Sequence, residues 1–182
     1  MTMKSKTDLK DVFSGLSSIL MKNGESANFT TFVPDYDMPV TVDSLSMTQE
    51  APTLNHNKVH GLQSDWAVTA TAGNFTFSAT VPSVSTDVVG FFMGTTTPVA
   101  TAAINSVNYT GVAASLTANK IVVSIALISE DKSHCVAINR MALYATPLFE
   151  NASTTPFGFK LTGSIELTDT SENSVWFLKK AV

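Results

Sequence analysis

The chain has 182 residues, which is enough for one compact domain with a core and an appended arm, but hardly for two full domains. Only 14% of the residues are charged while 44% are hydrophobic, and Ser and Thr are unusually frequent, a composition that favours strands. The net charge of −4 and a single arginine, Arg140, argue against a protein that reads nucleic-acid bases or clamps phosphates.

A lone cysteine, Cys135, excludes an internal disulfide, so burial and hydrogen bonds must hold the fold together. The first ten residues are polar and the stretch after them is interrupted by Asp11 and several serines, so no secretory signal is expected. No apolar run approaches the roughly 20 residues that a membrane helix needs. We therefore expect a protein that is made in a reducing cytoplasm and has no membrane partner.

The N-terminal segment, residues 1–39, is interpreted as a helix followed by an arm. Apolar residues recur at helical spacing between Asp8 and Lys22, at Leu9, Val12, Phe13, Leu16, Ile19 and Leu20. Asn23-Gly24 can end that helix. From Asn28 to Pro39, two prolines and a polar cluster predict an irregular, extended connector.

Residues 40–182 are predicted to form a β-rich domain. Strand signals begin with the alternation from Val40 to Met47, which contains a one-residue shift typical of a bulge, and residues 50–61 are predicted to form a loop. Residues 66–70 and 75–81 predict a hairpin, because the four residues between them are favourable in turns. Residues 83–93 have helical spacing and predict a short helix that packs a phenylalanine onto the sheet.

The strongest pattern in the chain is a long hairpin. Residues 121–129 and 134–145 flank a polar turn at 130–133, after a weaker strand expected at 102–109. The first half of this hairpin is apolar on both faces, which is expected only where both faces are covered. We therefore expect a second subunit to cover one of them. The predicted interface residues are Ile121, Val123, Ile125, Leu127, Met141 and Leu143.

The last predicted pair of strands lies at 157–167 and 175–178, with a turn at 169–174 between them. The first of these strands alternates apolar and polar residues, so one face should meet the core and the other should meet water. The whole pattern predicts a mainly β fold: an antiparallel β-sandwich or barrel with a short flanking helix, a long hairpin and an N-terminal arm or helix.

Residues suited to catalysis or metal binding are few. His56 and His60 have the spacing of a zinc pair on a helix, but a nearby proline and glycine argue against a helix, and in an extended chain the rings lie about 13 Å apart. His134 directly precedes Cys135, and neighbours on a strand point to opposite faces, so they predict no dyad. Cys135 is expected to be a small buried residue. We expect no enzyme activity, no cofactor and no metal site.

The order of the predicted elements resembles that of the major tail tube proteins of long-tailed bacteriophages. The shared features are an early polar arm, strands on both sides of a short helix at 83–93, a long hairpin and a closing pair within 157–178. The stretch 157–167, Phe-Gly-Phe-Lys-Leu-Thr-Gly-Ser-Ile-Glu-Leu, is similar to the final sheet strands of that family. The resemblance covers roughly Val40 to Leu178.

This resemblance implies a virion tail protein made in a host cytoplasm. Its copies would join their sheets into a hexameric ring with a continuous inner barrel, and the rings would stack into a tube that passes DNA as non-specific cargo. Residues 1–39 and 147–156 would lock neighbouring rings, and other virion tail proteins would be further partners. The family's lumen tends to be negative, and we expect Asp43 or Glu166 to face it.

Two other functions stay open at this point. One is a capsid decoration or head-to-tail connector protein. The other is an adhesin or carbohydrate-binding β-sandwich, which predicts a cluster of aromatic residues on an exposed face. Trp66 and Trp176 both lie in strand runs, where burial is expected, and the absence of a visible signal peptide disfavours an adhesin.

Overall fold

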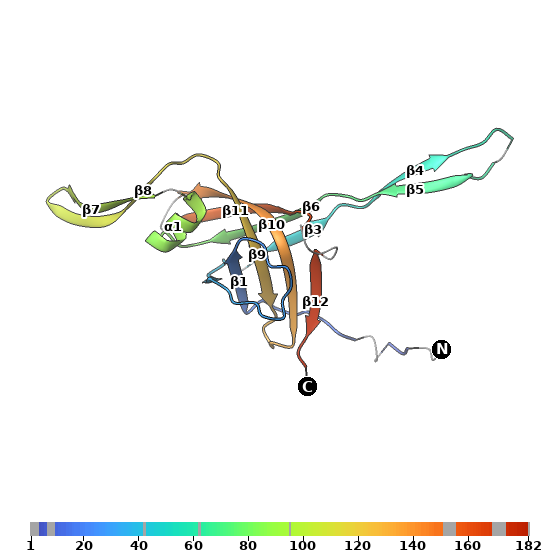
Figure 1. Ribbon diagram of the computed structural model, residues 1–182, viewed down its shortest axis with the longest axis horizontal. Coiled ribbons are helices and arrows are strands. Elements are labelled where there is room, and N and C mark those ends of the chain that lie inside the picture. The colour runs from blue at the N-terminus through green and yellow to red at the C-terminus, as the bar shows by residue number, and fades with distance from the viewer. Residues whose placement is uncertain are drawn as a thin grey trace.

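The structure is a computed structural model that describes residues 4–6, 10–41, 43–61, 63–94, 96–150, 156–168 and 174–181. These residues form antiparallel sheets with one short helix, as the sequence predicts. In chain order the elements are β1 (Ser18–Asn23), β2 (Tyr36–Met38), β3 (Ser46–Gln49), β4 (Thr53–Asn57), β5 (Ala67–Thr71), β6 (Phe75–Val81), α1 (Thr86–Met93), β7 (Thr96–Ile104), β8 (Val107–Ala114), β9 (Lys120–Ile128), β10 (His134–Leu148), β11 (Gly158–Ile165) and β12 (Val175–Lys179) (Figure 1).

One eight-stranded sheet builds the body, in the order β2-β1-β9-β10-β11-β6-β3, with β12 also beside β10. The predicted long hairpin is confirmed as β9 and β10. On the side away from β9, the first part of β10 pairs with β12 and the second part pairs with β11. The register shifts between Ile138 and Met141, and such a bulge bends a strand. The two groups of strands therefore cross in Figure 1.

The bent sheet wraps around one hydrophobic core. Strands β1, β6, β9, β10 and β11 each turn one face toward it, and the alternation predicted for β6 and for most of β11 is confirmed by their burial. The predicted core face of 157–167 fails at its two ends, since Phe157 and Leu167 are exposed. The largest fully buried side chains include Phe77, Phe92, Ile125, Met141 and Leu161.

Helix α1 covers one end of this core, so the prediction of a short helix is confirmed. The Ser85 hydroxyl accepts a hydrogen bond from the Val88 amide at 3.3 Å and caps the first turn. Gly94 follows the last turn with a φ of 74°. Phe92 is fully buried, and its ring centroid lies 5.2 Å from that of Phe159 on β11. This aromatic contact fixes the helix on the sheet.

The helix predicted between Asp8 and Lys22 is wrong. Residues 10–17 have no regular structure, residues 7–9 lie outside the described part of the chain, and the segment ends in β1. Within β1, the alternate side chains Ile19 and Met21 point into the core, and the backbone of the strand hydrogen-bonds to that of β9. Gly15, with a φ of 65°, interrupts any helix before it. The N-terminal segment thus contributes β1 and β2 to the main sheet.

The prediction of a closing pair of strands is confirmed for the strands and wrong for their pairing. Strands β11 and β12 lie where the sequence predicts them, but each pairs with β10 rather than with the other. The length of β10 explains this, because its 15 residues accommodate the two strands one after the other. The predicted turn lies mostly at 169–173, outside the described residues.

Two hairpin arms leave the body in opposite directions (Figure 1). The first arm is β4 paired with β5, and the second is β7 paired with β8. The sequence-based assignments here are wrong in several places. The loop expected at 50–61 contains β4, and the strand expected from Val40 begins only at Ser46, after a turn in which Asp43 has a φ of 63°.

The same arms overturn two further assignments. Strands β5 and β6 do not pair with each other, because they follow one another along one side of a ribbon whose other side is β3 and β4. The strand expected at 102–109 is broken by the turn Asn105-Ser106, in which both residues have a positive φ, of 50° and 64°. Two such residues form the tight connection that joins antiparallel strands with their natural twist.

Candidate assembly surface

The residues predicted to form a subunit interface are buried inside their own chain. Their exposed fractions range from 0% to 7%, and all of them belong to the core cluster. The residues are Ile121, Val123, Ile125, Leu127, Met141 and Leu143. The interface prediction is therefore wrong at these positions. The physical reason is that the sheet, which β1 extends beyond the edge of β9, bends at β10 and wraps this face around a core shared with β6, β11 and α1.

The opposite face of the β9–β10 hairpin is covered by residues 24–29. Asn139 is fully buried, and its amide Nδ2 donates to two backbone carbonyls of this segment at 2.8 and 3.0 Å. Its Oδ1 accepts a hydrogen bond from Nε1 of Trp176. The Phe29 ring packs edge-on against Trp176 at a centroid distance of 6.5 Å. A hairpin that is apolar on both faces is thus sheltered by one chain alone.

The β4–β5 arm is an uncovered surface of the molecule. Every residue of both strands is exposed. Leu54 is 53% exposed, Val68 is 50% exposed, and Trp66, which directly precedes β5, is 70% exposed. The expected burial of Trp66 is therefore wrong. Because an isolated two-stranded hairpin is marginally stable in water, large apolar side chains on such an arm indicate a binding partner.

The two faces of this arm differ in chemistry. Residues directly opposite each other share a face, so Leu54 lies with Ala70, and His56 lies with Val68. By alternation Trp66 continues this side, and we call Leu54, Trp66, Val68 and Ala70 the apolar stripe. The other face carries Thr53, Asn55, Asn57, Ala67, Thr69 and Thr71. One face of the arm is thus suited to an apolar partner and the other to water.

The β7–β8 arm has no charge at all. No Asp, Glu, Lys or Arg lies between Asp87 and Lys120. Near its tip Ile104 pairs with Val107, and Tyr109 shares their face two residues along. All three side chains are exposed. This arm also presents apolar side chains that the described part of the chain leaves uncovered.

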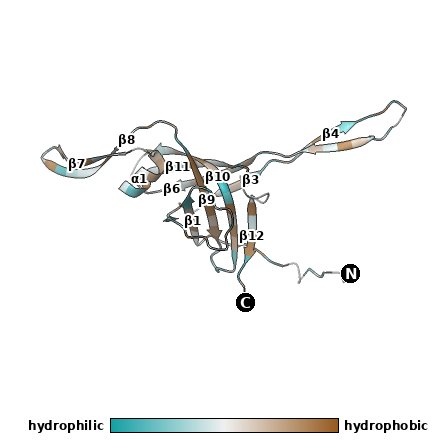
Figure 2. Ribbon diagram, viewed as in Figure 1, coloured by the Kyte–Doolittle hydropathy of each residue, from teal (hydrophilic) through white to brown (hydrophobic). Residues whose placement is uncertain are grey.

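A third apolar surface lies along β12, which is coloured as strongly hydrophobic in Figure 2. Phe177 is 83% exposed. Together with Phe13, Val136 and Leu178 it lines a groove of about 270 Å³, which Cys135 also borders. We call this the β12 groove. Among the described strands β12 pairs only with β10, so its outer edge is open for pairing.

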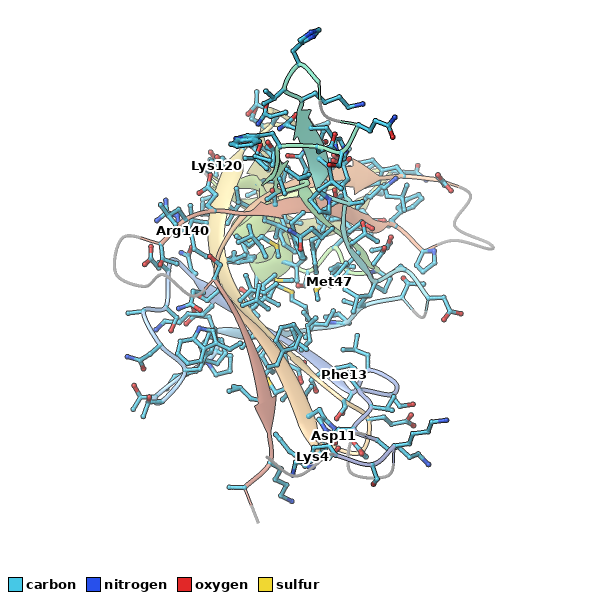
Figure 3. The ribbon with its side chains drawn as sticks, turned by 90° about the vertical axis from the view of Figure 1, so that its right-hand side faces the viewer. Lys4, Asp11, Phe13, Met47, Lys120 and Arg140 are labelled. Atoms are coloured by element: carbon cyan, nitrogen blue, oxygen red, sulfur yellow. The ribbon has the colours of Figure 1, made fainter. Side chains whose placement is uncertain are left out.

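Residues of β10 and β12 beside this groove hold the N-terminal segment in place through Asp11, which is labelled in Figure 3. The two carboxylate oxygens of Asp11 contact Nε2 of His134 at 2.7 Å and Nζ of Lys179 at 2.9 Å. The backbone amide of Ser17 donates to the Ile128 carbonyl at 2.8 Å. Hydrogen bonds from Lys179 and then from His134 lower the pKa of Asp11 below its ordinary value. These contacts form a latch between the N-terminal segment and the strands β10 and β12.

We expect acid to open this latch. A carboxylate whose pKa is lowered in the folded state stabilises that state above its unfolded pKa of about 3.9, and the contribution is lost as the pH falls through the folded value. Asp11→Asn should open the latch already at neutral pH. The measurement is the amide NMR signals of residues 12–17, which should move toward random-coil positions. Asp87→Asn, an exposed carboxylate on α1, should leave them unchanged. Native signals in the Asp11→Asn chain would contradict the latch.

Ser133, His134 and Asp11 contact one another in the order serine, histidine, aspartate, which is also the order in a hydrolytic catalytic triad. The Ser133 hydroxyl lies 2.6 Å from Nδ1 of His134, whose Nε2 meets Asp11. However, that hydroxyl also lies 2.6 Å from Oδ2 of Asp131, and hydrogen bonds from Ser129 and then Ser133 strongly lower the pKa of Asp131. A fixed carboxylate beside the hydroxyl opposes the negative charge that an attacking serine develops. The arrangement is suited to tying the β9–β10 turn together.

Glu166, one of the two predicted lumen residues, takes part in a charge network. Its carboxylate accepts hydrogen bonds from Nζ of Lys120 and, at 3.2 Å, from Nε of Arg140. Arg140 also pairs with Glu25 at 2.9 Å. The hydrogen bond from Lys120 is the main cause of the lowered pKa of Glu166. Two cations balance this carboxylate, so it adds little negative potential to any channel.

Asp43 lies far from Glu166. Its neighbour Ser44 accepts a hydrogen bond from the Thr80 amide, and Thr80 pairs with Lys160 on β11. Glu166 follows Lys160 by six residues, which is about 20 Å along an extended chain. Asp43 is exposed and stays a candidate for a lumen position, whereas the structure does not bring the two carboxylates together.

Comparison with known proteins identifies no relative: no family model matches the chain, and no curated protein matches it. Within the described residues, no helix is long and apolar enough to cross a membrane. No group of three or more histidine, cysteine and acidic side chains suited to a metal ion occurs in the same ranges. His56, one of the two histidines with metal-like spacing, instead pairs with Asp65 at 2.6 Å.

The surfaces that matter here were not predictable from the residues alone. The exposed arms depend on pairings between β4 and β5 and between β7 and β8, and neither contains the glycine-rich turn that marks a hairpin in a sequence. One signal was present, namely the uncharged stretch between Asp87 and Lys120. Such a stretch on a chain surface indicates contact with another protein surface.

Proposed function

We propose that this chain is a structural subunit that assembles with copies of itself, and that the assembly is the tube of a bacteriophage tail. The observation that carries the proposal is the pair of arms: every residue of β4 and β5 is exposed, and the β7–β8 arm exposes Ile104, Val107 and Tyr109 near its tip. A folded monomer gains nothing from such surfaces. A neighbouring copy would bury them.

The directions of the arms support head-to-tail contacts. The two arms differ in sequence and extend to opposite sides of the body (Figure 1). A surface that meets a different surface on the next copy gives a heterologous contact, and repetition of such a contact produces a closed ring or an open filament. Rings that stack into a tube use both kinds of repetition. The proposal includes hexameric rings, as the resemblance in element order implies.

The charges of the chain suit a conduit for DNA better than a DNA-binding surface. The net charge is −4, and the only arginine is held between Glu25 and Glu166. The 15 acidic residues outnumber the 11 Lys and Arg residues, so the balance of charge disfavours tight retention of phosphates and DNA would pass as non-specific cargo. The proposed location is the virion tail, where other tail proteins would meet the ends of the tube. Asp43 remains the residue that we expect to face the lumen.

Electron microscopy of the purified chain over a range of concentrations tests this function. We expect rings with a central channel, and stacked rings or tubes at the highest concentrations. Capsid decoration predicts particles that form only on a capsid lattice, and an adhesin predicts monomers. A chain that remains monomeric at all concentrations would contradict the proposal.

A further inference from the structure

The β4–β5 arm continues the body's ribbon without any break in register. Gln49 pairs with Phe75 at the end of the body, and Thr53 pairs with Thr71 at the start of the arm. Three residues lie between these pairs on each strand, a step of four positions on both sides, so no bulge intervenes and each face of the ribbon runs on from body to arm. The polarity of the two faces can therefore be compared directly along the ribbon.

That comparison reveals an inversion. On the body, the face with Met47 and Phe77 points into the core, and the face with Ser46 and Ser78 points to water. Along the arm the core-side face continues as the threonine and asparagine face, whereas the water-side face becomes the apolar stripe. An arm that merely extended the core would keep its apolar side where the body has it. The inversion indicates that the arm packs on something other than its own core.

The junction between body and arm is firmly built. The backbone amide of Glu50 donates to the Asn74 carbonyl at 2.9 Å, and the Asn74 side chain donates to Oε2 of Glu50 at 3.2 Å. At Gly73 an added Cβ would lie 2.2 Å from the Glu50 carbonyl oxygen, so only glycine lets the strands approach so closely. The arm thus leaves the body in a set direction, with the apolar stripe aimed at a set side.

A matching surface is present on the same chain. Among the described strands, three have open edges in the main sheet: β2, β3 and β12. The edge strand β3 is polar and β2 has only three residues, whereas β12 exposes Phe177 and Leu178 beside the β12 groove. The arm also has open edges, because within the described part of the chain β4 and β5 pair only with each other. Two open strand edges flanked by apolar side chains can pair with each other between chains, which adds a strand to the sheet of the receiving copy.

We propose that the β4–β5 arm binds a second copy of this chain, that it does so through the apolar stripe, and that the second copy receives it at the β12 groove. This inference rests on the proposed self-assembly and specifies its contact. The face of Thr69 stays in water in the assembly. Each copy both gives an arm and receives one.

A pair of neighbouring substitutions tests the arm. Val68→Asp places a carboxylate in the stripe, and Thr69→Asp places the same group one residue along on the opposite face. Both sites are exposed, so both variants should keep the thermal midpoint of the natural chain. In sedimentation velocity, Val68→Asp should raise the concentration needed for assembly about a hundredfold or more, and Thr69→Asp should change it by about twofold at most. Equal effects of the two variants would overturn the inference.

A pair of introduced cysteines tests the receiving site. Phe177 lines the β12 groove and is 83% exposed, whereas Cys135 pairs with Leu178 and therefore lies on the opposite face of the sheet. Chains that carry Cys135→Ser, Val68→Cys and Phe177→Cys are assembled and oxidised by dissolved oxygen with a copper catalyst at mildly alkaline pH. They should form disulfide-linked ladders on a non-reducing gel, and chains with Thr69→Cys in place of Val68→Cys should not. Ladders that are no stronger with Val68→Cys than with Thr69→Cys would overturn this site.

The outcomes separate this inference from the proposed function. If the natural chain does not assemble, both fail. If the natural chain and the Val68→Asp chain assemble alike, the proposed function stands and the docking of the arm on a second copy fails. A partner from another protein would give that second result.

Discussion

Replacing Asn139 with alanine is expected to lower the free energy of unfolding by about 3 kcal/mol or more. The side chain is fully buried, and its Nδ2 donates to the carbonyls of Ser26 and Ala27 while its Oδ1 accepts from Trp176. Alanine leaves the Ser26 carbonyl without this partner in a buried place, and the Ala27 carbonyl and the Trp176 indole without it in partly buried places. Since a domain of this size is stable by roughly 5–15 kcal/mol, the loss is a large share of the total.

Urea unfolding followed by circular dichroism measures this effect. Asn55→Ala is the matched control, because Asn55 lies on an exposed face of the arm and should change stability by less than about 0.5 kcal/mol. Trp176 fluorescence should also shift to longer wavelength in the Asn139→Ala chain as residues 24–29 lift away. An unchanged urea midpoint would mean that this cover of the hairpin contributes little.

Replacing Phe92 with alanine is expected to cost about 3–5 kcal/mol. The ring is fully buried between α1 and the sheet, with centroids 5.3 Å from Phe91 and 5.2 Å from Phe159. Its removal opens a cavity at the end of the core that α1 covers, and the helix, which is only 8 residues long, has little stability of its own. We expect α1 to detach before the sheet unfolds.

Hydrogen exchange resolved by segment tests that order of events. In the Phe92→Ala chain the amides of α1 should lose protection, while those of β9 and β10 keep most of theirs. Val84→Ala removes an exposed side chain just before the helix and should leave exchange unchanged. Protection of α1 equal to that of the natural chain would refute the role assigned to Phe92.

The elements that the sequence predicted well are those with strong local signals. The β9–β10 hairpin has two long apolar runs around a polar turn, and α1 has a serine cap and a terminal glycine. Strand β6 alternates cleanly. In these segments local propensity and the final environment agree, which makes a pattern readable without knowledge of its partners.

The N-terminal strand was misread because its pattern fits two periods. Leu16, Ile19 and Leu20 have helical spacing, yet Ile19 and Met21 also have the spacing of a strand face. The neighbouring edge of β9 decides in favour of the strand, and that edge is about a hundred residues away in sequence. The interface prediction failed for a related reason: the apolar pattern of residues 121–129 does not reveal that the bent sheet and residues 24–29 of the same chain cover the hairpin.

The arms could not be predicted for a different reason. The apolar residues of both arms have the weak alternating pattern that a core strand would also have. Only the pairing of the strands shows that these residues lie outside the core. The sequence did suggest an excess of apolar strand surface that a single chain cannot hide. That excess lies on the β4–β5 arm, the β7–β8 arm and β12, rather than on the central hairpin.

We infer that the body folds alone and that the arms join it to further copies. Replacing residues 53–71 with Asn-Gly closes the ribbon with a two-residue turn between residues 52 and 72, in the register that the body already has. Analytical ultracentrifugation of this shortened chain is the most direct test. We predict a folded monomer with the thermal midpoint of the natural chain, at concentrations where the natural chain forms rings. A shortened chain that assembles as readily as the natural one, or that no longer folds, would contradict the account.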